Sequence, residues 1–299
     1  MIFIIPGNYK PLIYCWRGGQ RSKSLTLILR QIGYDAHVLY GGYKEYRRVV
    51  RDYVQAEISE EVDKFRFILM SGNTGNGKSR ILEALRESGE QVLHLEEMAR
   101  HKGSVLGNYH QEPQPNQKYF ETEVYHFLHF KFKPERVVWV EYESFKIGNI
   151  TVPKVVSNKM IKSDRIHIEV DLEERIRFIM KVTPIFVLCV IMQMPDYFQD
   201  YSYLLEDKEL LLKSLDKLKR LAGKKKVDEW CEMVVKEENE ALVRGLVTDY
   251  YDKCYRIPRG EALHVYHVPD GLITDQAALL TSPLVSQITQ LGKDYLSDR

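Results

Sequence analysis

The sequence predicts an α/β fold: a P-loop domain with a mostly parallel sheet flanked by helices and a helical C-terminal region, preceded by a smaller α/β unit. Three observations predict it. Short apolar runs alternate with helical patterns along most of the 299 residues, which is typical of parallel βαβ units. A glycine-rich motif at Gly72 follows one of these runs directly. From about Glu206 to Tyr255 the pattern is helical, with a break near Gly223.

The first 56 residues are expected to form the smaller unit, and residues 57–299 the P-loop domain. A polar stretch over 57–64 is a plausible linker between them, and Gly33 is a natural C-cap for the first helix. The elements expected in the smaller unit are a strand over 12–14, a helix over 22–32, a strand over 38–40 and a helix over 43–54.

The larger domain is expected to build its sheet from apolar runs, each bounded by turn residues. The expected strands cover 65–70, 91–95, 137–140, 166–170 and 263–268. The expected helices cover 78–88, 117–131 and much of 206–255. An apolar stripe on the second helix is most often core packing at this spacing, although it could also line a slot for a long apolar chain. The stripe consists of Phe120, Val124, Phe127 and Leu128.

Composition is that of an ordinary globular protein, with 44% hydrophobic and 28% charged residues. No apolar run approaches the roughly 18 residues that a membrane-spanning helix requires, so no membrane partner is expected. The four cysteines are scattered without a CxxC pair, which argues against a disulfide framework and against a dedicated structural metal site. The apolar N-terminus has no basic leader, and together these features predict a cytoplasmic protein.

Charge is balanced overall, with a net charge of +1, but it is unevenly distributed. Residues 1–52 hold nine basic and three acidic side chains, and the remainder hold 34 basic and 39 acidic ones. Such a surplus could attract phosphate backbones, or it could be a solvated basic face. The proposed nucleic-acid face comprises Arg17, Arg21, Lys23, Arg47, Arg48 and Arg51, with Lys224, Lys225 and Lys226 as a second site.

The strongest motif is a phosphate-binding loop between an apolar strand and a helix-forming run. Its eight residues match G-x-x-x-x-G-K-[ST]: Gly72, Asn73, Thr74, Gly75, Asn76, Gly77, Lys78 and Ser79. The glycines let backbone N–H groups turn toward phosphates, and the helix N-terminus adds a favourable dipole. Lys78 can reach terminal phosphate oxygens, and the Ser79 hydroxyl can ligate Mg²⁺.

A magnesium-linked acid should lie at the end of a neighbouring strand. The run 137–140 is followed by Glu141, and Glu143 comes two residues later. A carboxylate there can hold a metal-bound water. An acid after a strand is also common on protein surfaces, so the phosphate loop is what makes these two residues candidates.

A second candidate site lies in the smaller unit, where Cys15 sits between a strand and a helix. The loop that follows includes Arg17, Gly18, Gly19 and Arg21. Loop N–H groups, a helix N-terminus and arginines all favour thiolate over thiol and stabilise a bound anion. Cys15 is therefore the candidate catalytic residue, and the alternative is a buried structural cysteine.

Taken together, these motifs resemble the bacterial tRNA 2-selenouridine synthase family, which joins a rhodanese-like domain to a P-loop domain. The matching segments begin with Cys-Trp-Arg-Gly-Gly-x-Arg-Ser from Cys15 and Gly-Gly-Tyr-Lys-x-Tyr-Arg from Gly41. They continue with the P-loop and with segments around His101, Gln114, Phe120, Glu141, Pro153, Met160 and Asp249–Asp252.

The resemblance implies a reaction on the wobble uridine of certain tRNAs. A 2-thiouridine is S-geranylated with geranyl diphosphate, and selenium from selenophosphate then replaces the geranylthio group to leave 2-selenouridine. By this resemblance Cys15 is the essential thiol, and the loop from Gly72 holds a phosphorylated substrate such as the diphosphate. The partners implied are tRNA and these two small molecules, with Mg²⁺ as an expected ion and no tightly bound cofactor.

The sequence departs from the family at three points. It begins just before the cysteine strand, so residues 1–56 match only the C-terminal half of a rhodanese-like domain, and another chain could supply the other half. His94 replaces an acidic residue, and Glu97 replaces a glycine. Two other functions stay open: a small-molecule P-loop kinase or NTPase, and a degenerate tRNA- or phosphate-binding homologue without full activity.

Overall fold

The computed structural model describes residues 9–56, 59–101, 113–142, 144–181, 212–213, 215–254 and 262–297. The chain divides into two compact units, residues 1–57 and residues 58–299. The boundary lies at the start of the polar stretch 57–64, but the prediction that this whole stretch is a linker is wrong. Residues 60–63 form a short helix of the larger unit, capped by the Ser59 side chain and held by the buried Val62. The fold class expected from the sequence is confirmed: an α/β protein with a mostly parallel sheet, flanking helices and a helical C-terminal region.

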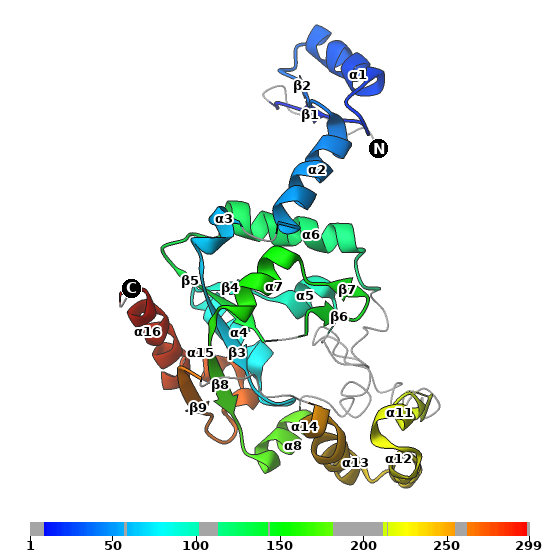
Figure 1. Ribbon diagram of the computed structural model, residues 1–299, viewed down its shortest axis with the longest axis vertical. Coiled ribbons are helices and arrows are strands. Elements are labelled where there is room, and N and C mark those ends of the chain that lie inside the picture. The colour runs from blue at the N-terminus through cyan, green and yellow to red at the C-terminus, as the bar shows by residue number, and fades with distance from the viewer. Residues whose placement is uncertain are drawn as a thin grey trace. The chain divides into compact units, whose positions relative to one another are not determined.

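The smaller unit is a βαβ element followed by a helix (Figure 1). Strands β1 (Leu12–Ile13) and β2 (His37–Val38) pair in parallel, and α1 (Gln20–Gln31) connects them. Helix α2 (Gly42–Val54) follows β2 after a tight turn. Both strands are shorter than the sequence predicts, because only two residues of each find a partner in this two-stranded sheet.

The larger unit is built on a five-stranded sheet in the order β4-β5-β3-β8-β9, with every neighbouring pair parallel. Its strands are β3 (Arg66–Ser71), β4 (Gln91–Leu93), β5 (Val137–Glu141), β8 (Asp164–Glu169) and β9 (His264–His267). Parallel sheets are covered on both faces, so their strands are almost continuously apolar. Strand β5 shows this, since all five of its residues are buried.

Successive side chains of β3 enter different layers of the core. Ile68 and Met70 pack with α4 (Lys78–Glu87) and α16 (Pro283–Ser297) in one apolar cluster. Phe67 and Leu69 are equally buried and, by strand alternation, face the other side of the sheet. Helices therefore cover both faces and bury the strand that leads into the phosphate loop.

Further helices complete this unit. They are α3 (Glu60–Asp63), α5 (Leu95–Ala99), α6 (Gln117–His126), the π-helix η1 (Phe127–Lys131), α7 (Lys154–Ile161), α8 (Leu172–Lys181), the 3-10 helix η4 (Leu272–Thr274) and α15 (Gln276–Leu280). A small antiparallel hairpin joins β6 (Lys146–Ile147) to β7 (Ile150–Thr151). The sequence did not predict this hairpin or the helices after residue 270.

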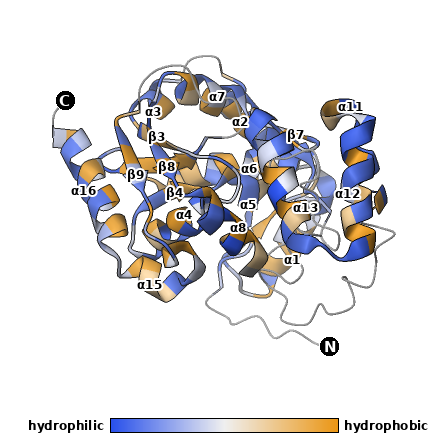
Figure 2. Cartoon of the chain, turned by 90° about the horizontal axis from the view of Figure 1, so that it is seen from below, coloured by the Kyte–Doolittle hydropathy of each residue, from blue (hydrophilic) through white to orange (hydrophobic). Residues whose placement is uncertain are grey.

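The helical C-terminal region contains α11 (Lys219–Ala222), α12 (Lys224–Lys236), α13 (Asn239–Leu246), the π-helix η3 (Val247–Tyr251) and α14 (Asp252–Cys254). The break predicted near Gly223 is confirmed, since this residue separates α11 from α12 and has a φ of 87°. Along α12 apolar and polar stretches alternate (Figure 2), and Val227, Trp230 and Val234 are buried. Of the expected helical residues, 206–211, 214 and 255 lie outside the described part of the chain.

Three of the four residues in the apolar stripe on the second expected helix belong to the core, with Phe120 and Val124 fully buried and Leu128 nearly so. The fourth, Phe127, is half-buried. Its helix is not uniform, because α6 passes into η1 after His126. Within the described residues, no helix combines the length and the apolar character needed to cross a membrane.

Candidate functional site

Cys15 lies two residues after the end of β1 and begins the loop that leads into α1. Its Sγ accepts a hydrogen bond from the Gly19 N–H at 3.2 Å and lies 3.3 Å from the Ser22 Oγ. The Ser22 hydroxyl bond, assisted by loop N–H groups, lowers the pKa of Cys15 to about 6. The thiolate is therefore the main form at neutral pH, and the thiolate is the nucleophilic form of cysteine.

Glycines are needed in this loop because the backbone at the start of α2 lies close to the backbone around Cys15. Gly42 has a φ of 63°, and a Cβ there would lie 2.1 Å from the Cys15 carbonyl oxygen. Instead, the Tyr43 N–H donates to that oxygen at 2.9 Å, and the Lys44 N–H donates to the Trp16 carbonyl at 2.9 Å. The first N–H groups of α2 thus hold the thiol loop in place, as the four unpaired donors at a helix start allow.

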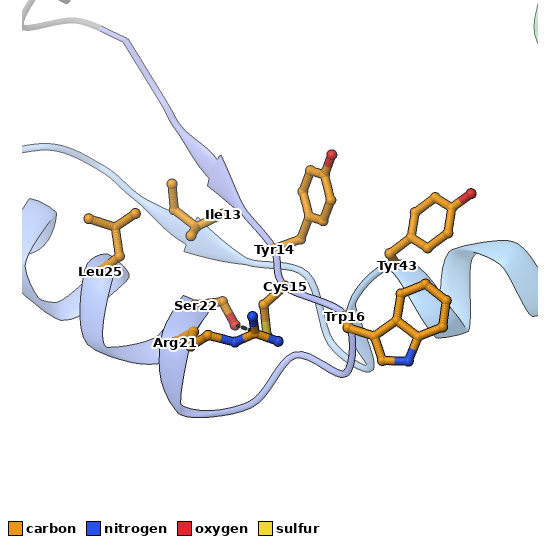
Figure 3. A pocket seen from close by; sticks show the side chains of 8 residues that line it. All are labelled: Ile13, Tyr14, Cys15, Trp16, Arg21, Ser22, Leu25 and Tyr43. Atoms are coloured by element: carbon orange, nitrogen blue, oxygen red, sulfur yellow. Dashed lines mark hydrogen bonds between the residues drawn. The ribbon is translucent and has the colours of Figure 1, made fainter.

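A pocket of about 470 Å³ opens at the sulfur (Figure 3). Its lining combines apolar residues, one guanidinium and the thiol: Ile13, Tyr14, Cys15, Trp16, Arg21, Ser22, Leu25 and Tyr43. The rings of Trp16 and Tyr43 lie 5.5 Å apart at one side, and Arg21 brings positive charge. The pocket can therefore take an anionic group that carries or adjoins an apolar or aromatic part.

The four residues predicted to stabilise the thiolate contribute differently. Gly19 donates its N–H to sulfur, and Arg21 lines the pocket. Gly18 makes the turn, with a φ of 64°. The Arg17 backbone also lowers the pKa of Cys15, while its side chain is exposed and lies outside the pocket lining.

The phosphate loop runs from the end of β3 to the start of α4, where the sequence predicts it. Gly75 and Gly77 have φ values of 85° and 70°, which only glycine adopts without strain. A Cβ on Gly75 would lie 2.8 Å from Ile179 of α8, and one on Gly77 would lie 2.7 Å from Ile273 of η4. Neighbouring elements therefore enclose the loop closely on two sides.

Polar contacts fix the remaining loop residues. The Asn76 side-chain amide donates to the Ile168 carbonyl of β8 at 2.5 Å. The Lys78 Nζ donates to the carbonyls of Gly72 and Asn73, at 2.5 and 3.3 Å. Ser79 is exposed in the first turn of α4, so its hydroxyl suits a magnesium ion that also touches a phosphate.

Arg175 of α8 also contacts the loop, and no sequence motif indicated it. Its Nε and Nη2 donate to the Thr74 carbonyl at 2.9 and 2.8 Å. Its Nη1 and Nη2 pair with the two carboxylate oxygens of Asp252 at 2.9 and 2.6 Å. Asp252 belongs to a motif that the sequence does show, whereas nothing local marks Arg175.

His167 is a second residue that the sequence did not indicate. It lies on β8 opposite Ser71, with its Nδ1 3.0 Å from the Ser71 Oγ. The Ser71 hydroxyl donates to the Ile166 carbonyl at 2.8 Å, so the network assigns the shared proton to His167 Nδ1 and leaves Nε2 as an acceptor. Burial lowers the pKa of His167, and the charges of Arg165 and Lys78 lower it further.

Glu141 lies at the carboxyl end of β5, in register with Met70 of β3 and thus near the start of the phosphate loop. Both of its carboxylate oxygens have protein partners, since Oε2 lies 2.8 Å from His94 Nδ1 and Oε1 accepts from the Glu96 N–H. Burial alone would lower the pKa of His94, but the charge of Glu141 raises it. A role of Glu141 in magnesium binding stays a prediction, and Glu143 lies outside the described residues.

Among the residues that the structure describes, no group of three or more His, Cys, Asp or Glu side chains is arranged to hold a metal ion. The Ser79 hydroxyl is the group that best fits Mg²⁺ at the phosphate loop. Magnesium there would be held by this hydroxyl and by the phosphates of a bound ligand.

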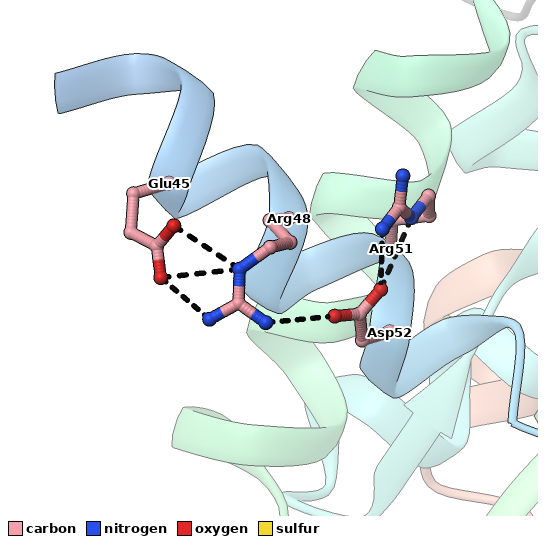
Figure 4. Close-up of polar contacts among 4 residues, drawn as sticks. All are labelled: Glu45, Arg48, Arg51 and Asp52. Carbon is pink, nitrogen blue, oxygen red and sulfur yellow. Dashed lines mark hydrogen bonds and ion pairs between the residues drawn. The ribbon is translucent and has the colours of Figure 1, made fainter. Parts of the chain in front are cut away.

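Acidic side chains pair with some of the basic residues of the predicted nucleic-acid face. Arg48 pairs with Glu45 at 2.5 Å and with Asp52 at 3.1 Å, and Arg51 pairs with Asp52 at 2.8 Å (Figure 4). Acidic neighbours on α2 therefore offset these two arginines. In the second proposed site Lys226 pairs with Asp249 at 2.8 Å, while Lys224 and Lys225 are exposed.

Comparison with known proteins finds related sequences. The family model described as "tRNA 2-selenouridine synthase AAA domain" matches residues 65–264. The tRNA 2-selenouridine synthase of Marinobacter nauticus is 29% identical over 266 residues, covering 81% of this chain and 66% of the relative. That of Alcanivorax borkumensis is 29% identical over 262 residues, covering 84% and 68%. That of Bdellovibrio bacteriovorus is 35% identical over 179 residues, covering 58% and 44%. The chain thus spans about two thirds or less of the length of these relatives.

Proposed function

Because the chain belongs to the tRNA 2-selenouridine synthase family, we propose that it acts in converting wobble 2-thiouridine of tRNA to 2-selenouridine. The route proposed passes through S-geranyl-2-thiouridine, with geranyl diphosphate and selenophosphate as donors. The observation that carries the proposal is the presence of two different anion-binding loops in one chain. One offers an acidic thiol, and the other offers the backbone and lysine of a phosphate loop.

The phosphate loop suits the alkylation step. In that step the sulfur of 2-thiouridine forms a bond to the first carbon of the geranyl group, and the carbon–oxygen bond to diphosphate breaks. The diphosphate leaves with the bonding electron pair, and the uridine N3–H proton is released. Loop N–H groups, Lys78 and the α4 N-terminus would stabilise that leaving group. Magnesium held at Ser79 would supply further charge neutralisation when bound.

The thiol loop suits the step that uses selenophosphate. The Cys15 thiolate lies beside a pocket that includes the Arg21 guanidinium, and a guanidinium binds phosphate-like oxygens well. The Gly19 N–H and the Ser22 hydroxyl both contact the Cys15 sulfur, and such contacts stabilise a thiolate. They support an active thiol rather than a degenerate homologue.

We also propose that the smaller unit binds a polypeptide over α1. This helix buries the polar residues Ser22 and Thr26. By contrast, Leu25 and Ile28 are 47% and 57% exposed, and Ile32, the residue that ends the helix, is 65% exposed. Polar side chains are buried here and apolar ones are exposed, which gives the helix an apolar surface suited to a protein partner. A complementing α/β segment that covers this surface should raise the melting temperature of the chain, and the variant Ile28→Glu should abolish that gain.

The decisive experiment is mass spectrometry of nucleosides from thiolated tRNA incubated with this protein, geranyl diphosphate and selenophosphate. We expect S-geranyl-2-thiouridine and 2-selenouridine from the wild type. Lys78→Ala should lose both products, and Cys15→Ser should accumulate only the geranylated one. Steady hydrolysis of ATP or GTP without either nucleoside would instead favour a P-loop NTPase, and tRNA binding with no turnover would favour a degenerate homologue.

A further inference from the structure

Arg175 occupies an unusual place, because one buried guanidinium contacts two distant parts of the chain. Its side chain is 5% exposed. Two of its nitrogens donate to the Thr74 carbonyl of the phosphate loop, and two contact Asp252 at the start of α14. The guanidinium thus bridges loop residues 72–79 and the helical region that contains Asp252.

The contact to Thr74 acts on the shape of the loop. A phosphate loop binds anions through N–H groups that must all point inward, so the carbonyls between them must point outward and find partners there. Thr74 directs its carbonyl to Arg175, and the neighbouring Gly75 leaves no room for a Cβ against Ile179 of the same helix. Helix α8 therefore lies against the Thr74–Gly75 peptide, through Arg175 at the carbonyl and Ile179 at the glycine.

Asp252 in turn fixes the guanidinium. A buried arginine needs a compensating carboxylate, and removal of that partner leaves an uncompensated charge. Asp252 is that carboxylate, and each of its two oxygens accepts a hydrogen bond from one Nη atom of Arg175. Such a bidentate pair holds the guanidinium plane in one orientation. The same segment is anchored to α12, since Asp249 of η3 pairs with Lys226 at 2.8 Å.

We propose that Arg175 and Asp252 are positioning residues that hold the phosphate loop in its anion-binding shape, and that the helical region carrying Asp252 thereby sets the affinity of the loop for a diphosphate group. The inference rests on the proposed function for its ligand, but its structural part concerns the loop alone. Neither residue needs to touch the ligand, because both act through the Thr74 carbonyl.

A second ion pair offers a matched control. Arg244 of α13 pairs bidentately with Glu173 of α8 at 2.6 and 2.8 Å, so it also ties α8 to the helical region. Arg244 is more exposed than Arg175, and Glu173 lies at the surface. Within the described part of the chain, neither partner hydrogen-bonds to the phosphate loop. A role that consists only of docking α8 on the helical region would be shared by both pairs.

The test compares the full-length wild type with Arg175→Lys, Asp252→Asn, Arg244→Lys and Glu173→Gln. Inorganic pyrophosphate with magnesium is titrated by calorimetry, and hydrogen exchange of loop peptides covering 72–79 is measured without ligand. We expect the first two variants to raise the pyrophosphate dissociation constant about tenfold, as removal of a supporting partner does at metal sites. Their loop amides should exchange faster, while the two control variants should match the wild type in both measurements.

A charge-swapped double variant, Arg175→Asp with Asp252→Arg, separates the ion pair from the loop contact. It keeps a salt bridge between α8 and α14 but gives the Thr74 carbonyl no donor from α8. We expect it to recover much of the melting temperature that either single variant loses, yet to bind pyrophosphate as weakly as Asp252→Asn. Recovery of pyrophosphate binding would overturn the proposal, because a salt bridge alone would then suffice.

The outcomes separate this inference from the proposed function. Faster loop exchange in the Arg175 and Asp252 variants, in a protein that binds no pyrophosphate, would support the positioning role and contradict diphosphate binding. Tight pyrophosphate binding with unchanged exchange and affinity in those variants would contradict the positioning role and leave the function intact.

Discussion

At the scale of single residues, reactivity here is set by neighbours rather than by residue type. Cys15 has a low pKa because Ser22 and the Gly19 N–H contact its sulfur. Cys231 has a raised pKa because burial disfavours its charged form. The sequence marked Cys15 as a candidate because the glycines and arginines of its loop are local, and Ser22, which lowers its pKa most, lies only seven residues away.

The pH dependence of Cys15 alkylation follows from this contrast. The lowered pKa predicts that the rate of reaction with iodoacetamide rises with pH and levels off above an inflection near pH 6. Ser22→Ala removes the hydrogen bond that lowers this pKa most, so the inflection should move upward toward the ordinary thiol value of 9.0. Peptide-resolved mass spectrometry measures both, with Cys231 as an internal control that reacts only at higher pH. An inflection that Ser22→Ala leaves in place would contradict the assigned cause.

The phosphate site shows where prediction from sequence ends. Its eight loop residues were predictable because their spacing is local and each has a fixed geometric task. Arg175 was not, because its two partners are 101 and 77 residues away. The same holds for His167, which meets Ser71 across 96 residues. Side chains that act through partners on other elements leave no periodic or local signature in a single sequence.

At the scale of elements, the strands of the sheet were predictable, and the helices after residue 270 were not. Strands β3 and β5 are runs of buried apolar residues, which is typical of central parallel strands. Helix α16 showed no clear signal in the sequence. It packs closely on the sheet at Gly292, where an added Cβ would lie 2.9 Å from Trp139 of β5. The helix over 117–131 was predicted, but its change to a π-helix at Phe127 was not.

Glycine substitutions test how closely α8 encloses the phosphate loop. Gly75 and Gly89 have similar positive φ values of 85° and 92°, but only Gly75 has atoms within 4 Å of an added Cβ. Gly89→Ala should therefore cost about 1 to 2 kcal/mol from backbone strain alone. Gly75→Ala should cost at least about 1 kcal/mol more, because its methyl group meets Ile179.

Denaturant unfolding measures both free energies, and pyrophosphate titration should show weaker binding for Gly75→Ala only. Equal destabilisation of the two variants would mean that Ile179 of α8 moves aside at little cost and that α8 does not constrain the loop.

At the scale of the whole molecule, several of the described basic side chains are paired with acidic ones. The surplus in residues 1–52 includes arginines of α2 that are offset by Glu45 and Asp52. Lys224 and Lys225 are exposed at the start of α12, where the helix dipole adds further positive character. These two lysines are the better candidates for contacts with RNA phosphates.

Salt titration of tRNA binding tests this distribution. A lysine that neutralises one RNA phosphate contributes slightly less than one to the magnitude of the slope of log K against log salt. We expect Lys224→Glu with Lys225→Glu to weaken binding and to reduce that slope by about two. The double variant Arg48→Ala and Arg51→Ala should change the slope little. Filter binding between low and high salt measures both, and a slope unaffected by the lysine changes would remove α12 from the interface.

The pairing of the Trp16 and Tyr43 rings has a practical consequence. The chain has three tryptophans, and Trp139 and Trp230 are fully buried whereas Trp16 is 52% exposed beside Cys15. Acrylamide or iodide should therefore quench chiefly the fluorescence of Trp16. Occupation of the thiol pocket can then be followed in solution by emission alone, without a label, because the protein carries its own fluorophore at the edge of that pocket.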